Sequence, residues 1–259
     1  MDQNVRAAKN SNGGSFFEDN FPVQAKLYIT TVILAGLSIF FYCLYRSMAQ
    51  ADFRWLYLAA FTVLGSCFPV KIPLLKVKKQ SLTITVSDVF IFVAILFLGP
   101  VMAVTLAVLE GLTSSLRVRV KRLYKQLFNM AQLATVAFVV GKIFLSLRAP
   151  MQLESLRPSS LMVLAVEMVL CGLLYFLLNS GFVAFAIALV THQQFSELWS
   201  QNFLWALPAD SAHALTAATV FILVQPVTLS IVVALIPILG VAYYARRVKL
   251  ARDRQGIQT

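Results

Sequence analysis

Apolar residues along the chain gather into long runs, several of which are long enough to cross a lipid bilayer. A membrane-spanning helix needs about 20 mostly apolar residues, because the hydrocarbon layer is about 30 Å thick and each residue rises about 1.5 Å. Asn179, Ser180 and Gly181 interrupt the longest run and mark a break point. The runs predict helices over residues 27–44, 55–68, 127–147, 161–190, 213–224 and 228–244.

A different pattern lies between the second and third of these runs. Apolar and polar residues alternate over 82–86, which together with 71–80 indicates an extended connector rather than a helix. Ser87 and Asp88 then predict an N-cap for a helix over 89–98. Gly99 and Pro100 interrupt the apolar run before it continues over 101–116. This pattern predicts a tight hairpin of two short helices.

The composition excludes a soluble globular domain. Apolar residues make up 59% of the 259 residues and charged residues only 13%, and the mean hydropathy is +0.78. The net charge of +11 alone would suggest nucleic acid, but a nucleic-acid binder has no need of long uncharged runs. The lipid bilayer is therefore the expected partner, and the expected fold is all-α, a polytopic transmembrane helix bundle.

Positive charge predicts the orientation of this bundle, since Lys and Arg near span ends stay on the cytoplasmic side. Fourteen of the 22 Lys and Arg fall in three clusters, at 71–79, 117–125 and 246–254. With a cytoplasmic N-terminus, successive crossings place all three clusters and the C-terminus in the cytoplasm. We expect eight membrane segments, or six if the short segments around Gly99 or Pro226 dip in and return.

Three regions of different character are predicted along the chain. Residues 1–25 are polar and nearly neutral and form a disordered lead, residues 26–245 form one transmembrane bundle, and residues 246–259 form a basic cytoplasmic tail. The stretch 191–211 has no Lys or Arg, and its aromatic residues suit a helix lying at the membrane interface.

Polar residues inside the apolar runs indicate where a ligand would bind, because such residues generally face the bundle interior. They form stripes at helical spacing, with members at 167, 171, 175 and 179, at 129, 132 and 135, at 110, 113 and 114, and at 213, 216 and 219. Convergence of these stripes would create a polar pocket for a small polar or amphiphilic ligand. The predicted ligand-binding residues are Glu110, Asn129, Gln132, Glu167, Tyr175 and Asn179.

Each of these residues also has a structural interpretation. Asn and Gln in membrane helices often only form hydrogen bonds between helices, with about 0.6 kcal/mol each. Glu110 is near enough to the cytoplasmic basic cluster to reach a Lys or Arg, and Glu167 could sit near the outer interface. Asp88 is best explained as a helix cap, and His213, close to a helix start, as a solvated or capping residue.

No catalytic motif is present, so we expect no enzymatic activity and no cofactor. The chain lacks HExxH, GxSxG, phosphate-binding and dinucleotide-binding patterns. Cys43, Cys67 and Cys171 lie in apolar runs without metal-binding spacing and are interpreted as packing residues. The basic loop residues are expected to contact lipid head groups or a partner; they include Arg117, Arg119, Lys121, Arg122, Arg246 and Arg247.

The segment LTITVSDVFIFVAILFLGPVMAVTLAVLEGL at 82–112 resembles the N-terminal membrane region of bacterial GGDEF and HD-GYP signalling proteins. FNMAQLATVAF at 128–138 and LLNSGFVAFAIAL at 177–189 are similar to motifs of the same family. The first segment is also similar to the substrate-binding S component of energy-coupling-factor vitamin transporters. Together the resemblance covers roughly residues 55–244.

The resemblance implies a multi-pass protein of the bacterial inner membrane that senses a small or lipid-like ligand. In the signalling family a catalytic domain follows the last helix, whereas here 15 residues follow Tyr244. The resemblance therefore implies a sensor or scaffold module, either alone or working with a cytoplasmic signalling partner. The alternative is the substrate-binding membrane component of a transporter, whose partner would be an ATPase.

Overall fold

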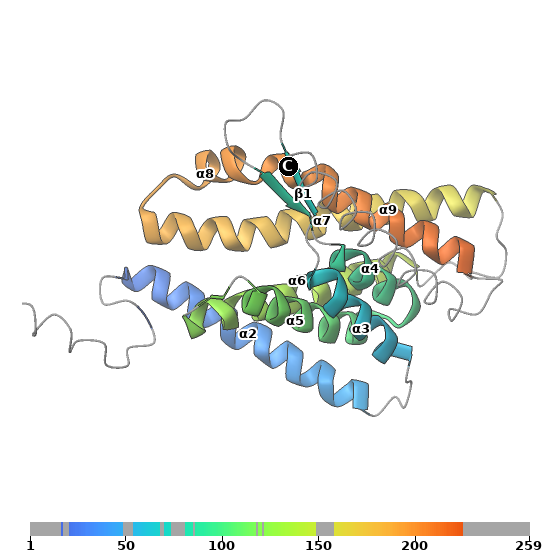
Figure 1. Ribbon diagram of the computed structural model, residues 1–259, viewed down its shortest axis with the longest axis horizontal. Helices are drawn as coiled ribbons and strands as arrows, with labels where there is room; N and C mark the ends of the chain where they lie inside the picture. The colour runs from blue at the N-terminus through green and yellow to red at the C-terminus, as the bar shows by residue number, and fades with distance from the viewer. Residues whose placement is uncertain are drawn as a thin grey trace, which may run out of the picture.

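The structure is a computed structural model, and it is a helix bundle with one small sheet (Figure 1). It describes residues 17, 21–48, 54–67, 70–73, 81–84, 86–117, 119–120, 122–148 and 158–224. The helices in these ranges are α2 (Val23–Met48), α3 (Arg54–Cys67), α4 (Ser87–Phe97), α5 (Pro100–Arg117), α6 (Leu123–Arg148), α7 (Pro158–Thr191), α8 (Phe195–Asn202), the 3-10 helix η1 (Leu204–Ala206) and α9 (Leu207–Val224).

Three of the described helices are long and apolar enough to cross a membrane. They are Val23–Met48, Leu123–Leu147 within α6 and Met162–Thr191 within α7. The outward faces of α2 and α7 are apolar, with Phe41 62% and Leu170 53% exposed, as expected for surfaces that contact lipid. The remaining described helices are shorter, so the eight crossings and the cytoplasmic termini stay predictions.

Helix α4 is too short to cross a bilayer and lies inside the bundle. Its 11 residues span about 16 Å at about 1.5 Å per residue. Every side chain from Val89 to Ile95 is buried, and α4 packs against α3, α5 and α9. A helix that is apolar on all sides is buried on all sides, and here neighbouring helices provide that cover.

The predicted hairpin of two short helices is confirmed. Gly99 joins α4 to α5 with a φ of +82°, a left-handed conformation that glycine adopts without steric cost. Pro100 is the first residue of α5, where its missing N–H leaves no helical hydrogen bond unmade. The extended connector before α4 is also confirmed at the two strands that the structure describes, because β2 (Ser81–Ile84) pairs antiparallel with β1 (Val70–Pro73); residues 74–80 and 85 lie outside the described residues.

The predicted break in the longest apolar run is wrong, since α7 is continuous over 34 residues. Figure 1 shows α7 extending along the long axis of the molecule. The side-chain oxygen Oδ1 of Asn179 accepts a hydrogen bond from Nε2 of Gln132, and the Ser180 hydroxyl donates to the backbone carbonyl of Phe176 in the same helix. Both polar side chains therefore find partners without interrupting the helix.

Two helices begin earlier than predicted. Helix α4 begins at Ser87, and its N-cap residue Val86 makes no side-chain cap hydrogen bond, so the capping role given to Ser87 and Asp88 is wrong. Helix α9 begins at Leu207 rather than near His213. Part of the predicted interfacial segment is helical as α8, whose place relative to the membrane stays a prediction. The predicted helix over 228–244 lies outside the described residues.

Candidate functional site

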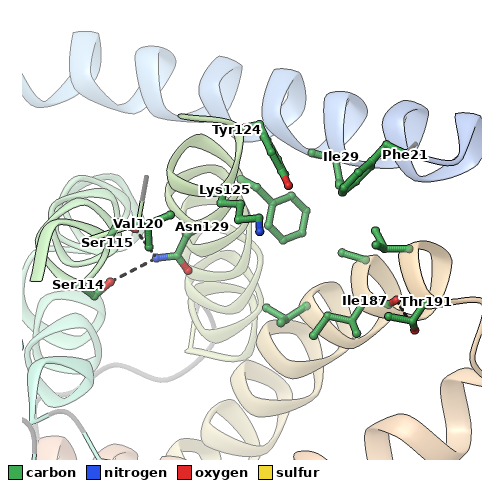
Figure 2. Close-up of a pocket in the computed structure, with 14 residues that line it drawn as sticks. Phe21, Ile29, Ser114, Ser115, Val120, Tyr124, Lys125, Asn129, Ile187 and Thr191 are labelled. Carbon is green, nitrogen blue, oxygen red and sulfur yellow. Dashed lines mark hydrogen bonds between the residues drawn. The ribbon is translucent and has the colours of Figure 1, made fainter. Parts of the chain in front are cut away.

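A cavity of about 480 Å³ opens between α2, α5, α6 and α7. Figure 2 shows side chains from all four helices pointing toward it. Most of the lining is apolar and includes Phe21, Ile29, Phe128, Val183, Ala186 and Val190. A cavity of this size and character is typical of a site for a small, largely apolar ligand.

One wall of the cavity is polar. Asn129 of α6 donates a hydrogen bond from Nδ2 to the carbonyl of Gly111, at 3.1 Å. The same nitrogen lies 3.3 Å from the hydroxyl oxygens of both Ser114 and Ser115. Lys125, one turn before Asn129, also lines the cavity and is exposed to solvent. This wall therefore offers hydroxyl and amide groups and one positive charge.

Aromatic contacts hold the start of α2 against the helices behind it. The rings of Phe17 and Phe21 lie 5.2 and 5.5 Å from the ring of Tyr124 on α6. Tyr28 donates a hydrogen bond of 3.2 Å to the carbonyl of Phe182 on α7. Helix α2 is thus tied to α6 and to α7 on either side of the cavity.

A second polar group lies where α4, α5, α7 and α9 meet. The Ser87 hydroxyl donates a hydrogen bond to Oε1 of Glu110 at 2.5 Å. Tyr175 donates its hydroxyl hydrogen to Oδ1 of Asp88 at 3.4 Å. His213 Nδ1 lies 3.7 Å from Oδ2 of Asp88. We call Asp88, Glu110, Tyr175, Asp210 and His213 the acidic cluster.

The acidic cluster is almost closed to solvent. Glu110 is 5% exposed, Tyr175 is fully buried, and the side chains of Asp88 and His213 are 15% and 11% exposed. Asp88 lies in the first turn of α4, where the positive end of the helix dipole favours a carboxylate. Buried carboxylates are costly unless they are hydrogen-bonded or paired. Tyr175 and the neighbouring Ser87 donate hydrogen bonds to these carboxyl groups, and His213 lies within ion-pair distance of Asp88.

The predicted ligand-binding residues lie in different parts of the bundle. Glu110 and Tyr175 belong to the acidic cluster, and Asn129 belongs to the polar wall of the cavity. Gln132 of α6 donates a hydrogen bond of 3.0 Å to the side chain of Asn179 on α7. Glu167 is buried on α7, on the face that carries Tyr175. The four stripes therefore do not form one pocket, and the ligand-binding role of these residues stays a prediction.

The stripe predicted from His213 is wrong, because Thr216 and Thr219 are exposed. Residues three apart on a helix are offset by about 60°, so two such steps rotate a side chain away from the starting face. His213 itself is buried and lies six residues into α9, not at its start. It is therefore neither a capping nor a solvated residue.

The basic residues predicted to contact lipid or a partner include three described arginines at the end of α5 and in the turn that leads to α6. Arg117 donates a hydrogen bond of 2.6 Å from Nη1 to the carbonyl of Ser66 at the end of α3. Arg119 and Arg122 are exposed, and Arg119 has a φ of +54° in the turn before α6. Lys121, Arg246 and Arg247 lie outside the described residues.

Sequence reasoning missed the association of Asp88, Asp210 and His213. Pro208 and Asp210 could have predicted that α9 begins earlier, because Pro and acidic residues are enriched in the first turn of a helix. An earlier start for α9 places His213 one turn after Asp210 on the same face, rather than at a helix end.

Comparison with known proteins connects this bundle to a family. The family model MASE9, which describes membrane-associated sensor domains, matches residues 38–249. Searches of curated proteins and of solved structures found no match. The family match does not support the transporter alternative, and the likeness to GGDEF and HD-GYP proteins stays a resemblance. The match spans most of the chain, and together with the three long apolar helices it shows that the chain is a membrane protein of the MASE9 family of sensor domains.

Proposed function

We propose that the chain is a multi-pass sensor of the bacterial inner membrane that binds a small amphiphilic ligand in the cavity between α2, α5, α6 and α7. The observation that carries this proposal is the cavity itself, which is mostly apolar but has one wall of serine, asparagine and lysine side chains. A sensor of lipid-soluble signals needs such a combination, because burial of the apolar part provides affinity and a few polar groups provide specificity.

The chemistry of the polar wall favours a ligand with an anionic or hydrogen-bonding head group. Lys125 provides a positive charge and the Ser115 hydroxyl can donate a hydrogen bond, while the Ser114 hydroxyl, which donates to the carbonyl of Gly111, can still accept one. The apolar part of the ligand would lie against the apolar lining, which includes Ile29 and Ala186. A medium-chain fatty carboxylate has this pattern and serves as a first probe.

Binding in this cavity would change how the helices pack. Helix α2 and helix α7 form facing walls, so a ligand that prefers one separation of these walls shifts the population toward it. The cavity reaches the α5–α6 connection through Val120 and Lys125, next to the exposed Arg119 and Arg122. We propose that a cytoplasmic signalling partner reads the change at this basic surface, and that the sensor has no enzymatic activity of its own.

The binding test uses radiolabelled decanoate with the purified chain in detergent, with empty micelles as background and decanol as the neutral probe of equal length. Lys125→Gln is expected to weaken decanoate binding by about tenfold, the effect of about 1.4 kcal/mol, and to leave decanol binding unchanged. Lys142→Gln is the matched control, because Lys142 is an exposed lysine of the same helix. Equal binding of decanoate by both variants would contradict an anionic head-group site beside Lys125.

A second pair of variants tests the cavity itself. Ala186→Phe places a ring in the cavity and is expected to abolish binding of both probes, whereas Thr219→Phe adds a ring on an exposed face of α9. Binding that survives Ala186→Phe would refute the cavity as the site. Spin labels at exposed Leu34 of α2 and Leu177 of α7 then report the separation of the helices, which should change on addition of decanoate if the chain is a sensor.

A further inference from the structure

We propose that Asp88, Asp210 and His213 form a binding site for a divalent transition-metal ion such as Zn²⁺. The three residues come from α4 and α9, and one ligand atom of each lies within 4.8 Å of the others. Imidazole nitrogen and carboxylate oxygen are both ligands of Zn²⁺ in proteins, and a site with three protein ligands leaves a fourth position open. The site is separate from the cavity proposed for the amphiphilic ligand.

The distances between the ligand atoms fit a metal better than they fit direct contacts. His213 Nδ1 lies 3.7 Å from Asp88 Oδ2 and 3.8 Å from Asp210 Oδ1, which is too long for a hydrogen bond. Ligand atoms about 2.1 Å from a tetrahedral zinc ion are about 3.4 Å apart. A shift of a few tenths of an ångström would therefore bring the imidazole to this distance from each carboxylate, and the ligand oxygens of the two carboxylates lie within 4.8 Å of each other.

The imidazole nitrogen supplies an independent indication of a ligand. His213 is 8% exposed, and its Nδ1 is buried without a hydrogen-bond partner among the described residues. Nearly all buried polar atoms of folded proteins have such a partner, so an exception requires an explanation. This nitrogen lies within 4 Å of an oxygen of each carboxylate, and a cation bound by all three groups would provide the missing partner.

Neighbouring residues hold the proposed ligands in place. The Tyr175 hydroxyl donates to Oδ1 of Asp88, which leaves Oδ2 facing His213. Hydrogen bonds of this kind from outside the ligand set orient metal-binding carboxylates and contribute to affinity. Glu110 lies beside Asp88 and accepts a hydrogen bond from Ser87, so its carboxyl group is held next to the proposed ligands.

The site keeps a small contact with solvent. The side chains of Asp88 and Asp210 are each 15% exposed. The long helix α7 covers the opposite side through Tyr175. A bound ion would link α4 to α9 and stabilise the contact between these two helices.

The test uses Co²⁺ and Zn²⁺ with the full chain purified in detergent and freed of metal with a chelator. We expect one Co²⁺ per chain with a visible ligand-field absorption band, and displacement of Co²⁺ by Zn²⁺. His213→Gln should remove the band, and Asp88→Asn and Asp210→Asn should each lower the affinity at least about tenfold. His192→Gln is the matched control, because His192 is the other histidine of the chain and is exposed.

Thermal unfolding shows whether a variant that loses the Co²⁺ band is still folded. Zn²⁺ should raise the melting temperature of the wild-type chain and of His192→Gln, because an ion that binds the folded state stabilises it, but not that of His213→Gln. The proposal is overturned if no Co²⁺ band develops, if folded His213→Gln retains it, or if His192→Gln loses it as well. Decanoate binding does not enter this test, so the two proposals can fail separately.

Discussion

Gly36 of α2 allows a close approach to α6, another helix that borders the cavity, and Gly36→Ala should force the two helices apart. A methyl group at residue 36 would lie 2.6 Å from the Cα of Ala131 on α6, and it would also meet the carbonyl of Ala131. Non-bonded carbon atoms normally stay about 3.5–4.0 Å apart. The two helices must therefore separate locally by about 1 Å, because the neighbouring atoms belong to a backbone and cannot rotate away.

Gly181 of α7 provides the matched control for this change. A methyl group at residue 181 would meet no atom within 4 Å. Both substitutions gain the same helix propensity, about 1 kcal/mol for alanine over glycine. That gain cancels in the comparison, so the difference between the two variants measures the clash, which for overpacking is typically about 1–3 kcal/mol.

The assay is reversible unfolding of the purified chain in mixed micelles with increasing dodecyl sulfate, followed by tryptophan fluorescence. The free energy of unfolding should be lower for Gly36→Ala than for Gly181→Ala by about 1–3 kcal/mol. Decanoate affinity should also change in Gly36→Ala alone, because α2 forms a cavity wall. Equal stability of the two variants would refute the close contact between α2 and α6.

Two further predictions concern hydrogen bonds between helices. A double-mutant cycle of unfolding free energies with Gln132→Leu and Asn179→Leu should give a coupling energy of about 0.6 kcal/mol, and at most about 1.7 kcal/mol, as for other hydrogen-bonded pairs in membranes. If the two substitutions have additive effects on the unfolding free energy, the contact is contradicted. Ser180→Ala removes the acceptor of the Trp199 indole N–H, which lies 2.9 Å from the Ser180 hydroxyl oxygen. Amide hydrogen exchange in α8 should then become faster, with Ser146→Ala, at an exposed serine of α6, as a control that leaves it unchanged.

The sequence predicted the long helices because their signal is continuous and local. The runs at 27–44 and 127–147 lie within α2 and α6, and Gly99 and Pro100 separate α4 from α5 as expected. Twenty or so apolar residues can form few structures other than a helix in lipid, because every backbone polar group must be satisfied within the segment. Such predictions do not depend on which helices are neighbours.

The candidate sites were harder to predict because they depend on those neighbours. Asp88 after the extended connector has the position of a cap in the sequence, yet Tyr175 and His213 face it from helices more than 80 residues away. The helical spacing in the sequence placed Tyr175 and Asn179 on one face of α7. It could not show that Asn179 contacts Gln132 while Tyr175 contacts Asp88, because a helix face of this length meets several different helices.

Helix α5 contributes to both proposed sites, and this arrangement predicts that they influence each other. Glu110 belongs to the acidic cluster, and Ser114, one turn further along, lines the cavity. A metal ion that draws Asp88 toward His213 would alter the surroundings of Glu110 and hence the position of α5 beside the cavity. Binding free energies are linked reciprocally, so Zn²⁺ must change decanoate affinity by the same factor by which decanoate changes Zn²⁺ affinity. Titrations of each with and without the other measure both factors, and the coupling should vanish in His213→Gln. A factor of one in the wild-type chain, with both ligands bound, would show that α5 holds the two sites independently.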